Sequence, residues 1–230
     1  MDVGLRVHQL TRANTLATKR QIAAAFARIG SAQVVLPVVA LLAVARALVG
    51  GRGWFDLAAV VVVVLATGPV EWLIHVHVLH APDTAWVTRR LGLGLGHREH
   101  HLDPPELRWL MLRANEMAQF LVLLAVFTAM WALPLAWAFG GGLLGSYLSA
   151  LVLTTAVAGH YELTHLLVHT AYRPRTRYYA RLARNHRLHH YRNERYWLGV
   201  TSNMGDRLFH TLPRGDESVP RSATARTLSG

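Results

Sequence analysis

Four long apolar runs divide this chain of 230 residues, and they limit what it can fold into more than any other feature. The runs cover residues 33–50, 55–79, 117–139 and 143–169. Each one meets or approaches the ~20 residues that a helix needs to cross a hydrocarbon layer ~30 Å thick. A chain of this length has too little polar structure to cover four helices that are apolar all round, which argues against a soluble protein. We therefore predict an all-α, integral-membrane four-helix bundle.

Positive charge lies between and beyond these runs, and it predicts their orientation. Residues 1–30 hold five Lys and Arg, residues 81–113 hold five and residues 170–230 hold twelve, whereas the 140–146 turn holds none. The positive-inside rule then places both termini and the 81–113 loop in the cytoplasm. Attraction to anionic membrane lipids explains the net charge of +11, and no nucleic-acid recognition motif accompanies it.

Ten of the 14 histidines fall into four spaced clusters, which read HxxxxH, HxxHH, HxxxH and HxxHH along the chain. All four clusters lie at the predicted cytoplasmic ends of spans or in cytoplasmic segments, so they can converge as a helical cap on one side of the bundle. Neutral imidazole is the commonest transition-metal ligand, and the pattern predicts a histidine-rich site for two metals. Without a single cysteine, the chain offers metals only nitrogen and oxygen ligands. The candidate ligands are His75, His80, His97, His100, His101, His165, His169, His186, His189 and His190.

Helical spacing predicts which of these side chains face one another. His165 and His169 are four residues apart and share a face. On the second span, His80 is rotated by about 140° from His75 if the helix is an ideal α-helix. In each HxxHH cluster, the first two histidines share a face, whereas the third points elsewhere and is available to a second metal. This last feature favours two metals over one.

Two carboxylates accompany the clusters on the spans, because Glu71 lies one turn before His75 and Glu162 one turn before His165, each on the same face. Ionisable groups near a bilayer are expensive and usually functional. One interpretation is that they orient a ligating imidazole through its other ring N–H, and the alternative is an ordinary carboxylate on a helix surface. The candidates for groups around the ligands are Glu71, His77, His160, Glu162 and Asp206.

The complete histidine series resembles that of the fatty acid hydroxylase and sterol desaturase superfamily of integral-membrane di-iron enzymes. Residues 185–213 are similar to the family's closing signature, in which the last HxxHH precedes an aromatic-glycine segment, an aspartate, a phenylalanine and a threonine-leucine pair. Those later positions are Trp197, Gly199, Asp206, Phe209 and Thr211-Leu212. The likeness runs from about Glu71 to Pro213.

The resemblance implies two iron ions, which zinc can replace in purified protein, and no catalytic residue beyond the metal site. It also implies O2 as co-substrate and hydroxylation or desaturation of a lipid C–H bond, with a fatty acyl chain or sterol drawn from the bilayer. No fused cytochrome b5 domain is recognised, so we expect a separate ferredoxin or cytochrome to supply electrons. The arginine-rich 173–195 segment suits an acidic donor of this kind or anionic headgroups.

Two alternatives stay open at the level of sequence. Carotenoid ring hydroxylases of the same superfamily share the sequence style around the last clusters, so the substrate is not fixed. A histidine-rich metal transporter is the rival from another class, although transporters usually place coordinating residues near the bilayer midplane and contain repeats. The predicted organisation is a cytoplasmic segment over 1–30, a membrane-embedded catalytic domain over 31–213 and a disordered tail over 214–230.

Overall fold

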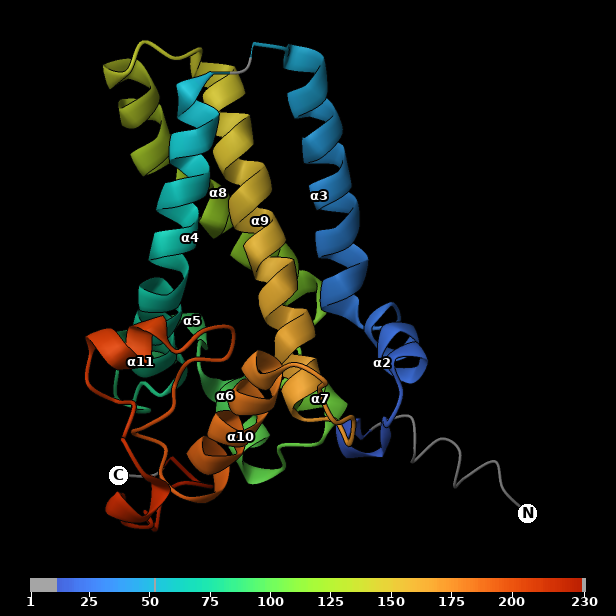
Figure 1. Cartoon of the computed structure of the whole chain (residues 1–230), viewed down its shortest axis with the longest axis vertical. Coiled ribbons are helices and arrows are strands. Elements are labelled where there is room, and N and C mark those ends of the chain that lie inside the picture. The colour runs from blue at the N-terminus through green and yellow to red at the C-terminus, as the bar shows by residue number, and fades with distance from the viewer. Residues whose placement is uncertain (1–11, 52, 229–230) are drawn as a thin grey trace. The chain divides into compact units, whose positions relative to one another are not determined.

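The computed structural model describes residues 12–51 and 53–228, and its regular elements are helices (Figure 1). Residues 1–11 of the predicted N-terminal segment and 229–230 of the predicted tail lie outside the described residues. The described chain forms two compact units. The membrane unit comprises residues 27–67 and 112–162, and the histidine unit comprises 68–111, 163–228 and the described residues up to 26. The all-α prediction is confirmed.

Four helical stretches are long and apolar enough to cross a membrane, as predicted. Between 11% and 28% of the most apolar window of each stretch is buried, so most of their apolar surface faces outward, where lipid can cover it. Their ends differ from the predicted ones by a few residues. The main helices are α3 (Gly30–Val49), α4 (Trp54–Ile74) with the π-helix η2 (His75–Leu79), α8 (Ala114–Ala138) and α9 (Leu143–Val168).

Small side chains form the contacts between helices in the membrane unit. Ala59 of α4, Ala132 and Ala136 of α8, and Ala150 of α9 are all fully buried in one cluster with Phe55. Small residues let helix backbones approach closely, which matters in a bilayer because the hydrophobic effect does not drive helices together there. Helices α4, α8 and α9 therefore pack closely against one another through this cluster.

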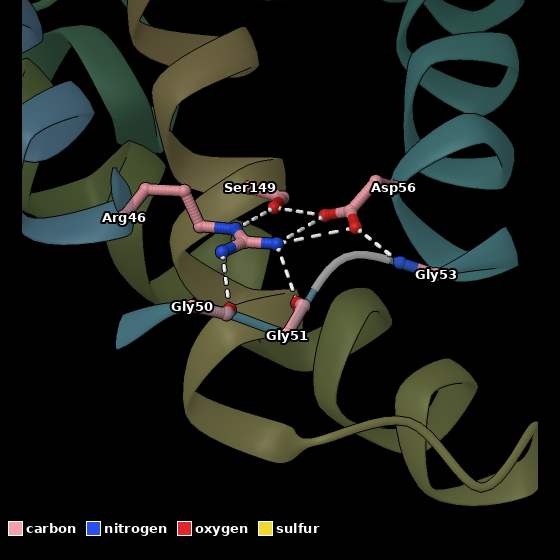
Figure 2. Close-up of polar contacts among 6 residues, drawn as sticks. All are labelled: Arg46, Gly50, Gly51, Gly53, Asp56 and Ser149. Atoms are coloured by element: carbon pink, nitrogen blue, oxygen red, sulfur yellow. Dashed lines mark hydrogen bonds and ion pairs between the residues drawn. The ribbon is translucent and has the colours of Figure 1, made fainter. Parts of the chain in front are cut away.

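A polar network closes the turn between α3 and α4 in the membrane unit (Figure 2). Arg46 donates to the carbonyls of Gly50 and Gly51, at 2.7 and 2.9 Å, and pairs with Asp56 at 3.0 Å. Ser149 of α9 hydrogen-bonds to both Arg46 and Asp56. A charge in an apolar bundle is tolerated when it is paired and hydrogen-bonded, so this network fixes the turn against α9. The sequence pattern did not reveal it.

Short helices build the histidine unit around two histidine-bearing ones, α6 (Leu95–Leu102) and α10 (Arg177–Tyr191). Helix α10 is amphipathic and buries Leu182 and Ala183 beside its histidines. The remaining elements are η1 (Ala13–Thr15), α2 (Lys19–Phe26), α5 (Trp86–Leu91), α7 (Leu107–Leu110), α11 (Met204–Leu208) and η3 (Asp216–Ser218).

Helix α11 packs directly on the last turns of α4 through a pair of glycines. A Cβ atom on Gly205 would lie 2.5 Å from the carbonyl oxygen of Gly68 and 2.5 Å from Cβ of Trp72. Both distances are far below van der Waals contact, so only glycine allows this approach. The stacked rings of Trp72 and Phe209, 4.1 Å apart, and a 2.8 Å hydrogen bond from Trp72 Nε1 to Thr211 Oγ1 secure the same contact.

The predicted disorder of residues 214–230 is not what the structure has up to Leu228. The segment contains η3, and its Val219 and Ala225 are buried. The amide of Ser222 donates to the carbonyl of Arg192 at 2.8 Å. Main-chain groups make many of these contacts, and a polar composition does not reveal them. This C-terminal segment, residues 215–228, is therefore part of the histidine unit.

Candidate metal centre

The ten clustered histidines gather into two groups of five in the histidine unit. Within each group, one ring nitrogen of every member lies within 4.8 Å of the others. The first group contains His75, His80, His97, His101 and His189. The second group contains His100, His165, His169, His186 and His190. The structure thus brings together every histidine that the spacing singled out.

Each HxxHH cluster contributes to both groups, but not in the way that the sequence predicted. The first and third histidines of a cluster stay together, as His97 and His101 do, and the middle one, His100, joins the other group. The same holds for His189, the middle histidine of α10. Residues four apart on an α-helix are offset by about 40°, and residues three apart by about 60° in the opposite sense. The prediction paired the first histidine with the second and was wrong, whereas the expected division of adjacent histidines is confirmed.

The predicted rotation of His80 away from His75 is also wrong, because the helix does not stay α-helical. Residues His75–Leu79 form a π-helix, and the amide of His80 donates to the carbonyl of His75 at 3.0 Å. A π turn closes over five residues instead of four, which returns His80 to the side of His75. The two rings lie 4.7 Å apart. π turns of this kind are frequent at functional sites.

Main-chain carbonyls hold three rings of the first group. In each case ring atom Nδ1 lies within 3 Å of a carbonyl oxygen from the C-terminal part of the chain. The pairs are His75 with Leu198 at 2.6 Å, His101 with Ala225 at 2.8 Å and His189 with Tyr196 at 2.9 Å. A carbonyl only accepts, so Nδ1 carries the hydrogen and Nε2 of each neutral ring presents its lone pair.

This protonation pattern tests whether the first group suits a metal. Nε2 of His101 and Nε2 of His189 lie 3.3 Å apart, and both are bare lone pairs in the neutral rings. Protonation would relieve the repulsion, but burial lowers the pKa of His101 to about 4 and that of His189 well below its usual range. A cation among the Nε2 atoms removes the conflict, and neutral imidazole is the form that binds metals. The residues therefore fit a transition metal.

The second group has fewer hydrogen-bond partners. Both ring nitrogens of His100, and Nδ1 of His186 and of His190, are buried with no hydrogen-bond partner among the described residues. Nε2 of His186 faces Nε2 of His169 at 2.9 Å and Nε2 of His190 at 3.0 Å. Burial lowers the pKa of each of these rings well below its usual range, which keeps them neutral. Unpaired imidazole nitrogens in a buried site also fit a metal.

The carboxylates Glu71 and Asp206 hold a loop, so Glu71 does not contact a clustered histidine as one interpretation of it expected. Glu71 accepts hydrogen bonds from the amides of Val200 and Thr201 and from the Thr201 hydroxyl. Asp206 accepts from the amides of Leu198 and Gly199, both at 2.9 Å, and burial raises the pKa of this carboxyl group. The loop that they hold supplies the Leu198 carbonyl to His75. Both residues therefore orient His75 indirectly, because they fix the loop whose carbonyl contacts its ring.

The other three candidates lie outside the two groups. Glu162 accepts a hydrogen bond from the amide of Leu112 at 3.3 Å, within the membrane unit. His77 is exposed, with its ring 6.2 Å from that of Trp72. His160 is exposed on α9. These positions give none of the three a role toward a clustered histidine.

Sequence reasoning missed the groups that orient the rings. The carbonyls of Tyr196, Leu198 and Ala225 belong to the main chain, so residue types carry no signal for them. Glu194 was also missed: the sequence shows an acidic residue four positions after the last cluster histidine, but its burial is visible only in the structure. Its Oε1 accepts from Ser222 Oγ at 3.0 Å and Thr224 Oγ1 at 2.7 Å, which ties the C-terminal segment to the turn that follows α10.

The chain matches a known protein family over most of its length. A family model described as fatty acid hydroxylase covers residues 60–211, which is more than half of the chain and includes all ten clustered histidines. No curated protein and no solved structure matches the chain. The family expected from the histidine series is confirmed.

Proposed function

We propose that this chain, which belongs to the fatty acid hydroxylase family, oxidises an unactivated C–H bond of a lipid with O2. Membership of this family implies a membrane oxidoreductase of the hydroxylase or desaturase type. The observation that carries this proposal is the pair of facing Nε2 lone pairs of His101 and His189, 3.3 Å apart in a buried site. Neutral rings in this arrangement need a cation between them.

The two groups divide the metal ligands between two sites. His75, His80, His97, His101 and His189 would hold one iron ion, and His100, His165, His169, His186 and His190 the other. When bound, the iron pair supplies the reduction of O2 to an oxidant that can remove hydrogen from a C–H bond. All ten ligands are neutral, so the sites keep the full positive charge of the ions.

The reaction balances with two electrons from outside. In hydroxylation, the lipid, O2, two electrons and two protons give the alcohol and one water. In desaturation, two neighbouring C–H bonds are lost, and the same inputs give a double bond and two waters. Family membership does not distinguish hydroxylation from desaturation, because both reactions start with removal of one hydrogen from the lipid.

The chain's own residues hold the rings and exclude water. Carbonyls of Leu198, Tyr196 and Ala225 fix three rings with Nε2 turned inward, so little rearrangement is needed when a metal binds. Eight of the ten clustered histidines are buried, and the other two, His80 and His169, are half-buried. Dry surroundings protect a reactive oxidant from side reactions.

A separate electron donor would dock on the outer face of α10. Arg177, Arg181, Arg184 and Arg187 are exposed on this helix, whose other face carries His186 and His190. An acidic ferredoxin or cytochrome fits this charge. Charge reversal at Arg181 and Arg187 should slow electron transfer and weaken its salt dependence, with metal content unchanged. Equal rates in the variant and the parent would exclude this face.

The histidine unit is proposed to face the cytoplasm, on the positive-inside argument. Because the chain has no cysteine, a single introduced one reports its side without background. A Glu217→Cys variant should react with a membrane-impermeant maleimide only after the membrane is opened, and Gly142→Cys in intact cells. The reverse pattern would invert the topology.

Product analysis tests the proposed function. The chain is expressed with a compatible reductase, and whole-cell lipids and carotenoids are compared by mass spectrometry for a gain of about 16 Da or a loss of about 2 Da. A variant with both His100→Ala and His189→Ala is the control and should give no product. Unchanged lipids together with metal flux across the membrane would favour a transporter instead.

A further inference from the structure

Large apolar side chains are exposed along a short stretch of chain between the second span and helix α6. This Leu-Gly segment, residues 86–96, contains α5 and the first two residues of α6. The exposed fraction is between 36% and 66% for Trp86, Leu91, Leu93 and Leu95. Exposed large apolar side chains that gather in one place indicate a binding surface, because contact with water is unfavourable for them.

The main chain of the Leu-Gly segment is fixed, and this holds the exposed side chains outward. The amide of Gly92 donates to the carbonyl of Thr88, a buried residue, at 3.0 Å. Just beyond the segment, Arg98 donates to the carbonyl of Ala81 at 2.6 Å and pairs with Asp83 at 2.9 Å. These contacts tie both ends of the segment to the chain beside it, so the exposed leucines are part of a defined surface.

The Leu-Gly segment touches the second span at the point where that span ends. Gly94 has a φ of +86°, and a Cβ atom there would lie 2.7 Å from the carbonyl oxygen of Val78 and 3.0 Å from that of Leu79. Only glycine allows this approach. The span runs for 26 residues to Leu79, and a helix of that length measures about 39 Å, close to the thickness of a bilayer with its headgroups. In a bilayer, the contact at Gly94 therefore places the segment at the depth of the headgroups.

The charges of the Leu-Gly segment fit an anionic lipid surface. Arg89 and Arg90 are exposed beside the leucines, and the sequence has no acidic residue between Asp83 and Glu99. Tryptophan is enriched where a bilayer meets water, and leucine side chains enter the acyl region. Arginine near the surface is attracted to anionic headgroups. Position, apolar exposure and charge thus all favour lipid as the partner of this surface.

We propose that the Leu-Gly segment inserts into the adjoining leaflet of the bilayer and that Arg89 and Arg90 bind the headgroups of its anionic phospholipids. The exposed leucines then continue the lipid-covered surface of the second span. This contact goes beyond the proposed oxidation and does not depend on it, because it needs neither the metals nor the substrate. Helix α6 begins inside the segment, so the contact also fixes how far its three clustered histidines lie from the bilayer.

Fluorescence quenching of the full-length protein in nanodiscs tests the depth of the segment. Because the chain has no cysteine, Leu93→Cys takes a single bimane label. In the bilayer, 5-doxyl phosphatidylcholine should quench at least about half of its emission, and acrylamide in the water should quench little. The same label in Glu217→Cys, at an exposed position of the C-terminal segment, should respond in the opposite way. If Leu93→Cys behaves like Glu217→Cys, the inference is overturned and the surface is free for a protein partner.

A second labelled position keeps the test decisive if Leu93→Cys does not fold. Leu91→Cys replaces a side chain that is 53% exposed, so the change disturbs little packing. Its label should also be quenched by the doxyl lipid and protected from acrylamide. Quenching by acrylamide alone at this position would overturn the inference as well.

Spin-labelled lipids of different charge test the role of the two arginines. At equal mole fraction, spin-labelled phosphatidylglycerol should quench the Leu93→Cys label at least about twofold more strongly than spin-labelled phosphatidylcholine. Added salt should lower this ratio, and removal of both charges in Arg89→Gln/Arg90→Gln should bring it to about one.

A matched double variant separates this effect from a general loss of positive charge. Arg214→Gln/Arg221→Gln also removes two exposed arginines, from the C-terminal part of the histidine unit, and should keep the ratio of the labelled parent. A ratio of about one in the labelled parent, or an equal fall in both double variants, would overturn the assignment of anionic headgroups to Arg89 and Arg90.

Discussion

The two histidine groups have the same number of ligands but different surroundings. The first group is held by carbonyls from the C-terminal part of the chain, and His80 opens it to a cavity. In the second group, His100, His186 and His190 have buried ring nitrogens without a hydrogen-bond partner among the described residues. The difference suggests a division of roles, in which the first site meets the substrate and the second is a closed partner. Changes that affect one group more than the other can separate these roles.

The largest effect is expected from the middle histidines, because each crosses to the other group. His100→Ala should empty the second site, even though His97 and His101 on the same helix belong to the first. His189→Ala should empty the first site. Metal content should fall from two toward one per chain, and activity should fall below about one hundredth. Metal analysis after dialysis measures this. The control His160→Ala changes a histidine outside both groups and should keep both metals. If His100→Ala and His189→Ala lose the same metal, the assignment of these two histidines to different sites is wrong.

Removal of residues 219–230 should weaken the first site selectively. The deletion takes away the Ala225 carbonyl that orients His101 and the contacts of Arg226 to the carbonyls of His101 and Leu102. Loss of a group that orients a ligand typically lowers metal affinity by about 10- to 100-fold. Competition with a chelator should show one weakened metal and one unchanged metal. Equal weakening of both would mean that the segment supports the whole unit.

Acid should destabilise the metal-free protein through its buried histidines. In the unfolded chain a histidine binds a proton as the pH falls through its usual pKa near 6.5, whereas folded His101 stays neutral to about 4. The unfolded state binds more protons in this window, so stability is full above about pH 6.5 and falls as the pH drops toward 4. Across this pH window, His101 alone accounts for a loss on the order of 3 kcal/mol in the free energy of unfolding. Thermal unfolding between these pH values checks the sign, and a rise in stability on acidification would contradict it.

The smallest effect is expected from Asp206→Asn. The amide has one acceptor oxygen where the carboxylate has two, so one of the hydrogen bonds from Leu198, Gly199 or Thr211 is lost. A buried donor without a partner costs about 1–3 kcal/mol, which thermal unfolding detects. The matched change Glu116→Gln removes an exposed ion pair with Arg113 and should lower the melting temperature by less than Asp206→Asn does. Similar shifts of the melting temperature in Asp206→Asn and Glu116→Gln would contradict the proposal that Asp206 holds the loop.

Sequence alone predicted the elements whose signal is local. Runs such as 143–169 identified the spans because crossing a bilayer requires length and apolar composition, whatever the neighbours are. The histidine spacing identified all ten clustered residues for a similar reason, since short intervals limit where side chains can point. The family match over residues 60–211 agrees with both.

What the sequence could not predict depends on the main chain and on distant contacts. The π turn at His75–Leu79 changed the facing of His80, and nothing in residue type distinguishes it from an α turn. The division of each HxxHH cluster depends on which helix lies opposite, and the positioning carbonyls carry no side-chain signature. The order of the C-terminal segment follows from its contacts with Arg192 and Glu194, which are invisible in its polar composition.

The central claim is that each group of five histidines holds one metal of an iron pair. Iron analysis combined with X-ray absorption on protein produced in iron-supplemented cells tests it most directly. We predict two irons per chain, both with nitrogen ligands, and one fewer in His100→Ala and in His189→Ala. A single iron per chain, or none in protein that still oxidises a lipid, would contradict the account.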